Sequence, residues 1–319
     1  MTVAKDNRMR LSEINEETVE AASNLFARAW AAERVSCPSL PDYPLGGPDA
    51  LRQEVASLAQ RGCIGAFDGG RLVGYMSAGF TFPFKGHRAG LCPVTGHAAE
   101  AGRGNEVYPL LYAAVGRIWA ERGDALHVIE HLAHDRALDR LLYELGFGMI
   151  VCERVRGLSA VGSSREHEVA RIDPTLLGGI EAEHSRYYSA SPIFVHKETH
   201  PDAIAAGLRE IEDAGCAFLA CFRGGEPVGY CAVGPQSHPE GLLLRNTNSA
   251  QLRAAYVREP YRRSGIGGAL LDAAVTHARE AGFERIFVEH ETANLSGSAF
   301  WARHFAGYVH FSMRHVDLG

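Results

Sequence analysis

An internal repeat is the feature that most limits how this chain can fold. Residues 65–79 read GAFDGGRLVGYMSAG and residues 220–234 read ACFRGGEPVGYCAVG, with seven of fifteen positions identical. Each copy is an apolar run, a Gly-Gly turn and a second apolar run. Because glycine supplies the positive φ that tight hairpin turns need, each copy predicts a β-hairpin. Two similar hairpins 155 residues apart predict two similar domains.

The flanks of the hairpins repeat as well. Each hairpin follows two amphipathic segments and precedes an extended segment, a long helix closed by glycine, a strand, a short helix and a last strand. Each half therefore reads β-α-α-β-β-β-α-β-α-β. The predicted fold class is α/β (α+β), with two tandem domains that each contain a mixed, mostly antiparallel sheet flanked by helices. The expected helices are Glu16–Glu33, Pro48–Arg61, Tyr108–Arg122, Pro174–Ser189, Pro201–Ala214 and Gly265–Ala281, and the clearest later strands are 126–129 and 285–288.

Gly and Ser cluster at 157–165, where we place a linker between a first domain at 1–156 and a second at 166–319. The chain has 319 residues, a length typical of two domains.

Composition excludes several classes of function. The net charge of −6 argues against non-specific binding to nucleic acid or to an anionic membrane. The longest stretch without a charged residue, Leu72–Phe84, has 13 residues, well short of the roughly 20 that a membrane span needs. Seven cysteines without a CxxC motif, and a charged start without an apolar core, predict a cytoplasmic protein with buried free thiols.

The strongest local signal for chemistry lies in the second half. A predicted strand ends near Val257, and the glycine-rich loop Arg262–Gly268 then opens into an amphipathic helix. Amides of such a loop point into one concavity, and the first amides of the helix lack partners, so the junction suits a phosphate. Gly265, Gly267 and Gly268 allow a bulky anion close to the main chain.

This junction resembles the acyl-CoA pyrophosphate loop, RxxGxG, of the GCN5-related N-acetyltransferases (GNAT). The resemblance extends through residues 166–319 and includes Asn294-x3-Ser298-Ala299-Phe300-Trp301. It implies a bulged strand that splays from its neighbour, with the pantetheine arm along the backbone of 252–257. The residues that it assigns to acetyl-CoA are Tyr256, Val257, Arg262, Arg263, Ser264, Gly265, Ile266, Gly267, Gly268, Asn294 and Trp301.

The implied activity is transfer of an acetyl group to a primary amine by direct attack in a ternary complex, with acyl-CoA and an amine-bearing acceptor as partners. The acceptor and the oligomeric state cannot be read from the sequence. Trp301 stands where many family members carry a tyrosine that protonates the departing thiolate. For the general base we favour Glu289 or Glu291 acting through water, with His290 next, because all three end a strand that would line the acyl site.

The first half resembles the same fold more faintly. Where the RxxGxG loop should stand, it has Glu100-Ala-Gly-Arg-Gly-Asn-Glu106, whose two acids would repel a phosphate. We therefore predict a degenerate copy that has lost acyl-CoA binding.

Two alternatives belong to other classes of protein. The loss of the tyrosine is also compatible with a module that binds CoA or acyl-CoA without catalysis. The other alternative is a metal hydrolase whose ligands are His127, His131 and His134. If this segment were a helix, the three side chains would share one face. The segment LHVI is β-branched, however, and a strand would scatter these side chains, so no metal ligand is predicted.

Overall fold

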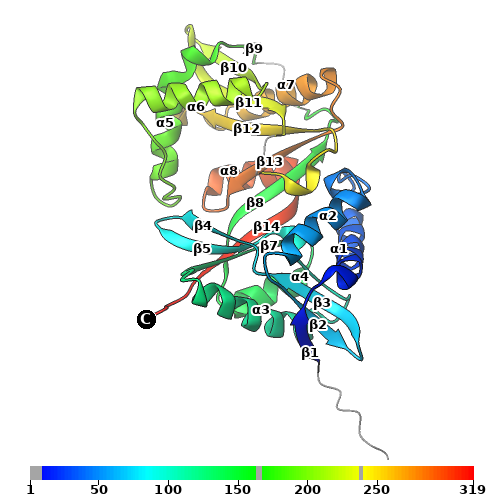
Figure 1. The fold of residues 1–319 in the computed structure, drawn as a ribbon. Coiled ribbons are helices and arrows are strands. Elements are labelled where there is room, and N and C mark those ends of the chain that lie inside the picture. The colour runs from blue at the N-terminus through cyan, green and yellow to red at the C-terminus, as the bar shows by residue number, and fades with distance from the viewer. Residues whose placement is uncertain (1–8, 163–166, 237–239) are drawn as a thin grey trace, which may run out of the picture. The chain divides into compact units, whose positions relative to one another are not determined.

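The structure is a computed structural model that describes residues 9–162, 167–236 and 240–319. It divides into two compact units (Figure 1). Unit 1 comprises residues up to Cys152 together with Tyr308–Gly319, and unit 2 comprises Glu153–Gly307. None of the helices in the described part of the chain is long and apolar enough to cross a membrane.

Unit 1 contains a four-stranded sheet, strands of a second sheet and four helices among its described residues. One sheet has the order β1-β2-β3-β6, and β4, β5, β7 and β14 (Ala306–His315) follow one another in the second. Its strands are β1 (Arg10–Glu13), β2 (Cys63–Asp68), β3 (Arg71–Ser77), β4 (Phe80–Phe84), β5 (His87–Cys92), β6 (His97–Ala99), β7 (Leu126–Leu132) and the start of β8 (Gly148–Gly157). Its helices are α1 (Glu16–Ser36), α2 (Pro48–Ala59), α3 (Gly104–Glu121) and α4 (Arg136–Glu144).

The second half of the chain follows the predicted order, with a single strand at each expected place. The strands β9 (Val169–Arg171), β10 (Ala217–Arg223), β11 (Glu226–Pro235) and β12 (Ser249–Val257) form an antiparallel meander, and β13 (Arg285–Glu291) pairs parallel to β12. The helices are α5 (Gly178–Ser189), α6 (Pro201–Asp213), α7 (Ile266–Glu280) and α8 (Leu295–His304). The predicted fold class and both predicted hairpins, β2–β3 and β10–β11, are confirmed.

The first half departs from the predicted order at one place. The single extended segment expected after its hairpin is divided into β4, β5 and β6, because the chain turns back at Lys85 and Gly86. Only β6 pairs with β3, and only β5 pairs with β7. The strand that should lead directly into the first loop is therefore interrupted.

Most of the last strand of the chain belongs to unit 1, although the predicted domain ranges include it in the second domain. Residues of β14 (Ala306–His315) pair antiparallel with β7 from Val309 opposite Leu132 to His315 opposite Leu126, and this pairing places Tyr308–Gly319 in unit 1. The predicted ranges assign those residues to the second domain. Strand pairing depends on backbone hydrogen bonds between distant segments, which no local pattern specifies. The repeat boundary at 157–165 stays a prediction.

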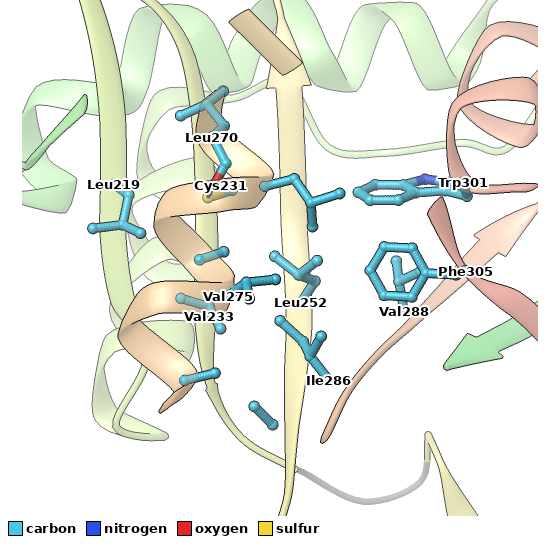
Figure 2. Packing of buried hydrophobic residues seen from close by; sticks show 14 of the residues in the cluster. Leu219, Cys231, Val233, Leu252, Leu270, Val275, Ile286, Val288, Trp301 and Phe305 are labelled. Carbon is cyan, nitrogen blue, oxygen red and sulfur yellow. Dashed lines mark hydrogen bonds between the residues drawn. The ribbon is translucent and has the colours of Figure 1, made fainter. Parts of the chain in front are cut away.

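The sheet of unit 2 is covered on both faces. Helix α7 packs over one face, with Leu270 and Val275 against Cys231 and Leu252 (Figure 2). Helices α5 and α6 cover the other face around Phe218 and Tyr230. A Cβ on Gly229 would lie 2.9 Å from Ile266 Cγ2, so the glycine of the repeated hairpin lets α7 approach β11 closely. All seven cysteines are free and buried, as predicted.

Candidate acyl-CoA and acceptor site

The glycine-rich loop of unit 2 curls around Ser264. Arg263 and Gly265 both have left-handed backbone angles, with φ of 64° and 92°. Ser264 donates its hydroxyl to the Tyr261 carbonyl at 2.7 Å, and its own carbonyl accepts from His167 Nε2 at 2.6 Å. Arg223 donates to the other nitrogen of His167 at 2.6 Å. Local hydrogen bonds thus hold the loop in shape, with basic side chains around it.

Helix α7 begins directly after this loop, and no side chain of the described residues caps it. By contrast, Asn294 caps α8 and Asp135 caps α4 by accepting from backbone amides. The first-turn amides of α7 remain available, and the helix dipole adds positive potential there. An anion at this point would meet amides without side-chain partners, and the anion site stays a prediction.

Strands β12 and β13 separate next to the loop. Their parallel pairing runs from Ser249 opposite Arg285 to Leu252 opposite Val288, whereas β12 continues its pairing with β11 as far as Val257. The register of the β11–β12 ladder shifts at Ala232/Val233, where Arg253 forms a bulge. The bulged, splayed strand implied by the resemblance is present. It leaves one edge of the β12 segment at 253–257, which includes Tyr256 and Val257, without β13 as a partner.

Arg262 connects the loop to the aromatic residues of α5. Its guanidinium lies 4.5 Å from the ring centroid of Tyr187 and 5.3 Å from that of Tyr256, and its Nε donates to the Val257 carbonyl at 3.0 Å. These contacts orient Arg262 at the end of β12, where it adds a fixed positive charge beside the α7 amides.

The three predicted catalytic candidates separate onto two faces of β13. Ile286 and Val288 belong to the core under α7, so strand alternation places His290 on that face and Glu289 and Glu291 on the opposite one. His290 is buried. Its Nε2 accepts from Arg154 Nε at 2.9 Å, and its Nδ1 lies 3.2 Å from the Glu291 carbonyl and 3.3 Å from Ser298 Oγ.

A cluster of aromatic residues lies on the α5 face, and sequence reasoning missed it. His184 stacks on Tyr256 with ring centroids 5.0 Å apart, and Tyr187 and Tyr188 contact the same pair; we call these four residues the α5 cluster. Burial, followed by the charges of Glu291 and Glu289 among other contributions, raises the pKa of Tyr188, so both carboxylates act on the cluster. The available signal was the spacing of Glu181, His184 and Tyr188 on one helix face.

Glu181 and His184 form a buried pair inside this cluster. Their closest atoms, Glu181 Oε2 and His184 Nδ1, are 3.0 Å apart, and Tyr230 donates its hydroxyl to the same carboxylate. Burial alone would raise the pKa of Glu181, but the hydrogen bond and charge of His184, the hydrogen bond from Tyr230 and the charge of Lys197 together lower it. Burial lowers the pKa of His184. The pair therefore consists of an ionised carboxylate and a neutral imidazole at neutral pH.

Two further predicted residues have well-defined surroundings. Asn294 Oδ1 accepts from the Gly297 amide at 3.0 Å and from the Tyr187 hydroxyl at 2.8 Å, which joins α8 to the α5 cluster. Trp301 is buried in the core of unit 2, where Figure 2 shows it beside Leu252 and Phe305. An indole N–H is a poor acid, so Trp301 cannot replace a tyrosine as a proton donor.

The corresponding loop of unit 1 is occupied by its own ion pairs. Arg103 donates to Asp68 at 2.8 Å and to Glu106 at 3.0 Å, while Arg71 binds Glu100 through two hydrogen bonds of 2.6 and 2.9 Å. The cation of this loop is already neutralised by carboxylates.

Comparison with known proteins agrees with this geometry. Residues 180–307 match the acetyltransferase (GNAT) family, and the matched segment lies entirely in the second half. No curated protein matches the chain. The fold is similar to that of a GCN5-related N-acetyltransferase from Sphaerobacter thermophilus (TM-score 0.57, 13% identity, 97% of this chain and 96% of that one). It is also similar to a tandem GNAT protein from the clavulanic acid biosynthesis pathway (TM-score 0.51, 14% identity, 98% and 99% of the two chains). The second half thus carries the match to the GNAT family, and the fold of the whole chain is similar to that of tandem two-domain GNAT proteins.

Proposed function

We propose that unit 2 binds acetyl-CoA and transfers its acetyl group to a primary amine by direct attack in a ternary complex. The observation that carries this proposal is the combination of the splayed β12–β13 edge with the uncapped, glycine-rich start of α7. The α7 amides, Arg262 and Arg263 would hold the diphosphate. The exposed edge of β12 at 253–257 would pair with the amide arm, and one of its backbone N–H groups would stabilise the oxyanion.

We propose that the acceptor amine approaches from the α5 face. Glu289 and Glu291 are on this face, and so is the neutral His184, whose Nδ1 is oriented by Glu181. A carboxylate or imidazole there can take the proton that the amine must lose before attack, directly or through water. Since Trp301 cannot protonate the thiolate, water or another residue would do so.

The α5 cluster also indicates the chemistry of the acceptor. The ammonium of Lys197 lies 4.4 Å from the ring centroid of Tyr188, so the cluster already accommodates an organic cation. Aromatic faces together with Glu181 favour amines that carry positive charge before reaction. We therefore propose a cationic acceptor, whose ammonium occupies the position that Lys197 takes here.

The test uses the full-length protein, because Glu153–Gly157 of β8 precede the predicted second domain yet belong to unit 2. Titration calorimetry with acetyl-CoA should give one site per chain, and release of CoA thiol should depend on an added amine. Binding of acetyl-CoA without amine-dependent thiol release would support the non-catalytic binding module instead. Absence of binding by the folded protein would refute both.

The catalytic assignment has a separate test. Glu289→Gln, Glu291→Gln and His184→Asn should leave the acetyl-CoA Kd unchanged, and the variant that removes the base should lower kcat by about 10²–10⁴-fold. Tyr188→Leu should raise KM for a cationic amine more than KM for an uncharged amine. If all three acid–base variants retain full kcat, the base lies elsewhere.

A further inference from the structure

Unit 1 contains a cluster of potential metal ligands that the proposed acetyl transfer does not use. His131 ends β7, Asp139 lies in α4, and His310 lies in β14. Nδ1 of His131 is 3.6 Å from Asp139 Oδ1, and Nδ1 of His310 is 3.3 Å from the same oxygen. All three donor atoms lie within 4.8 Å of one another. His131 and His310 face each other directly across the β7–β14 ladder, so their side chains share one face of the sheet.

The hydrogen bonds around His131 orient it toward this point. Its Nε2 lies 3.1 Å from Ser312 Oγ, which leaves Nδ1 directed at Asp139 and His310. The other group near Nδ1 is the Leu132 carbonyl at 3.4 Å. The two imidazoles meet edge to face, with centroids 5.5 Å apart and planes at 86°, so they converge rather than stack. Outer hydrogen bonds of this kind fix the tautomer of a metal-bound histidine.

Burial and charge also suit a divalent cation. The side chain of His131 is 1% exposed and that of His310 is 11% exposed, whereas Asp139, at 27%, leaves a path to solvent. The carboxylate of Asp139 supplies a negative charge beside the two imidazoles.

The distances between the ligand atoms can be compared with those around a tetrahedral metal ion. Four ligands at about 2.0–2.1 Å from a tetrahedral ion are separated by roughly 3.3–3.4 Å. The separations of the two imidazole nitrogens from Asp139 Oδ1, 3.3 and 3.6 Å, are close to that value, and the three donor atoms all lie within 4.8 Å of one another. Two imidazoles and one carboxylate favour zinc or a similar transition metal over calcium or magnesium. We propose that His131, Asp139 and His310 bind a zinc ion in unit 1, with water as the fourth ligand.

This site differs from the histidine motif considered from the sequence. His127 hydrogen-bonds to Tyr112 at 2.9 Å, and His134 contacts Glu33 at 2.7 Å, so the strand scatters the three histidines as predicted. His131 instead meets one ligand from the next helix and one from the end of the chain. The ion would connect β7, α4 and β14, and would therefore stabilise the pairing of the last strand with unit 1.

The first experiment measures zinc binding to full-length protein that has been stripped with a chelator. Calorimetry with zinc chloride should show one site per chain, and cobalt(II) should give the visible absorption of a tetrahedral complex. At zinc concentrations about 100-fold above Kd, Tm should rise by roughly 5 °C or more. Failure to bind zinc at one site per chain while the protein remains folded would overturn the proposal.

Variants locate the ion. His310→Ala and Asp139→Asn should each weaken zinc binding by more than about tenfold, since loss of even an outer partner of a ligand costs that much. Far-UV circular dichroism checks that both variants fold. The controls are His134→Ala, from the sequence motif, and His196→Ala, an exposed histidine with 82% of its side chain accessible. Both should bind zinc as the parent does. Equal zinc affinity in the parent, His310→Ala and Asp139→Asn would refute the assignment.

Discussion

The two loops that precede α3 and α7 occupy equivalent places in the repeat but differ in electrostatics. Both helices start without a side-chain cap, so both offer first-turn amides. Arg262 and Arg263 in the loop before α7, with Arg223 beside it, outnumber Glu259, whereas the arginine before α3 is paired with Asp68 and Glu106. We therefore expect the surrounding charge, and not the glycine-rich helix start alone, to decide which of the two loops attracts a phosphate.

The largest expected effect comes from adding a negative charge to one loop. Gly265→Glu should weaken acetyl-CoA binding by at least about 100-fold, or roughly 3 kcal/mol, because a carboxylate would face the diphosphate. Gly102→Glu is the matched control, since Gly102 has a similar left-handed φ of 81° in the loop of unit 1. Calorimetry should show an unchanged Kd for this control. Equal losses in the two variants would mean that the loops do not differ in function.

The second prediction concerns the glycines that let each helix approach its sheet. A Cβ at position 74 would lie 2.4 Å from Val107 Cγ1 and 3.2 Å from the Ala98 carbonyl, whereas one at position 229 would meet only side chains within 3.2 Å. Gly74→Ala and Gly229→Ala should each lower the free energy of unfolding by about 1–3 kcal/mol, with Gly74→Ala the more destabilising because backbone cannot move aside. Urea denaturation measures both. The reverse order would show that unit 1 packs more loosely than its contacts indicate.

A third prediction uses the buried histidine at the start of β7. Burial lowers the pKa of His127 to about 4, and its Nε2 is buried without a hydrogen-bond partner among the described residues. As pH falls from 6.5 to about 4, the unfolded chain takes up a proton that the folded chain does not, so stability falls by at most about 1.4 kcal/mol per pH unit from this group.

His127→Phe removes this titration and keeps a ring beside Trp119. Urea denaturation between pH 4.5 and 7.5 should show a shallower loss of stability toward acid pH than in the parent. Identical pH profiles for the two proteins would mean that His127 has an ordinary pKa.

The last prediction is that removing the acids from the loop of unit 1 leaves acetyl-CoA binding unchanged. Glu100→Gln with Glu106→Gln removes both acids from the loop of unit 1, yet Asp68 still binds Arg103, and the preceding strand remains divided into β4, β5 and β6. Calorimetry should still show one acetyl-CoA site per chain. A second site would mean that charge alone had disabled the first copy.

Much of the site could be predicted from local sequence. Glycine at the turns, the 3.6-residue period and the Gly-rich junction placed α7, its loop and both hairpins at or near their observed bounds. Because successive side chains of a strand point to opposite faces of the sheet, the sequence also accounts for the placement of His290 on one face of β13 and of Glu289 and Glu291 on the other. These features depend on residues close in sequence, whose backbone preferences act over one turn or one strand.

What only the tertiary structure decided is which distant residues meet. His184 stacks on Tyr256, Lys197 lies over Tyr188, and His310 faces His131 across a ladder that joins the end of the chain to unit 1. The hydrophobic periodicity of the sequence does not predict these contacts, because they depend on strand pairing and helix packing between segments far apart in the chain. The repeat determined the architecture of this protein, and long-range packing determined where its chemistry can occur.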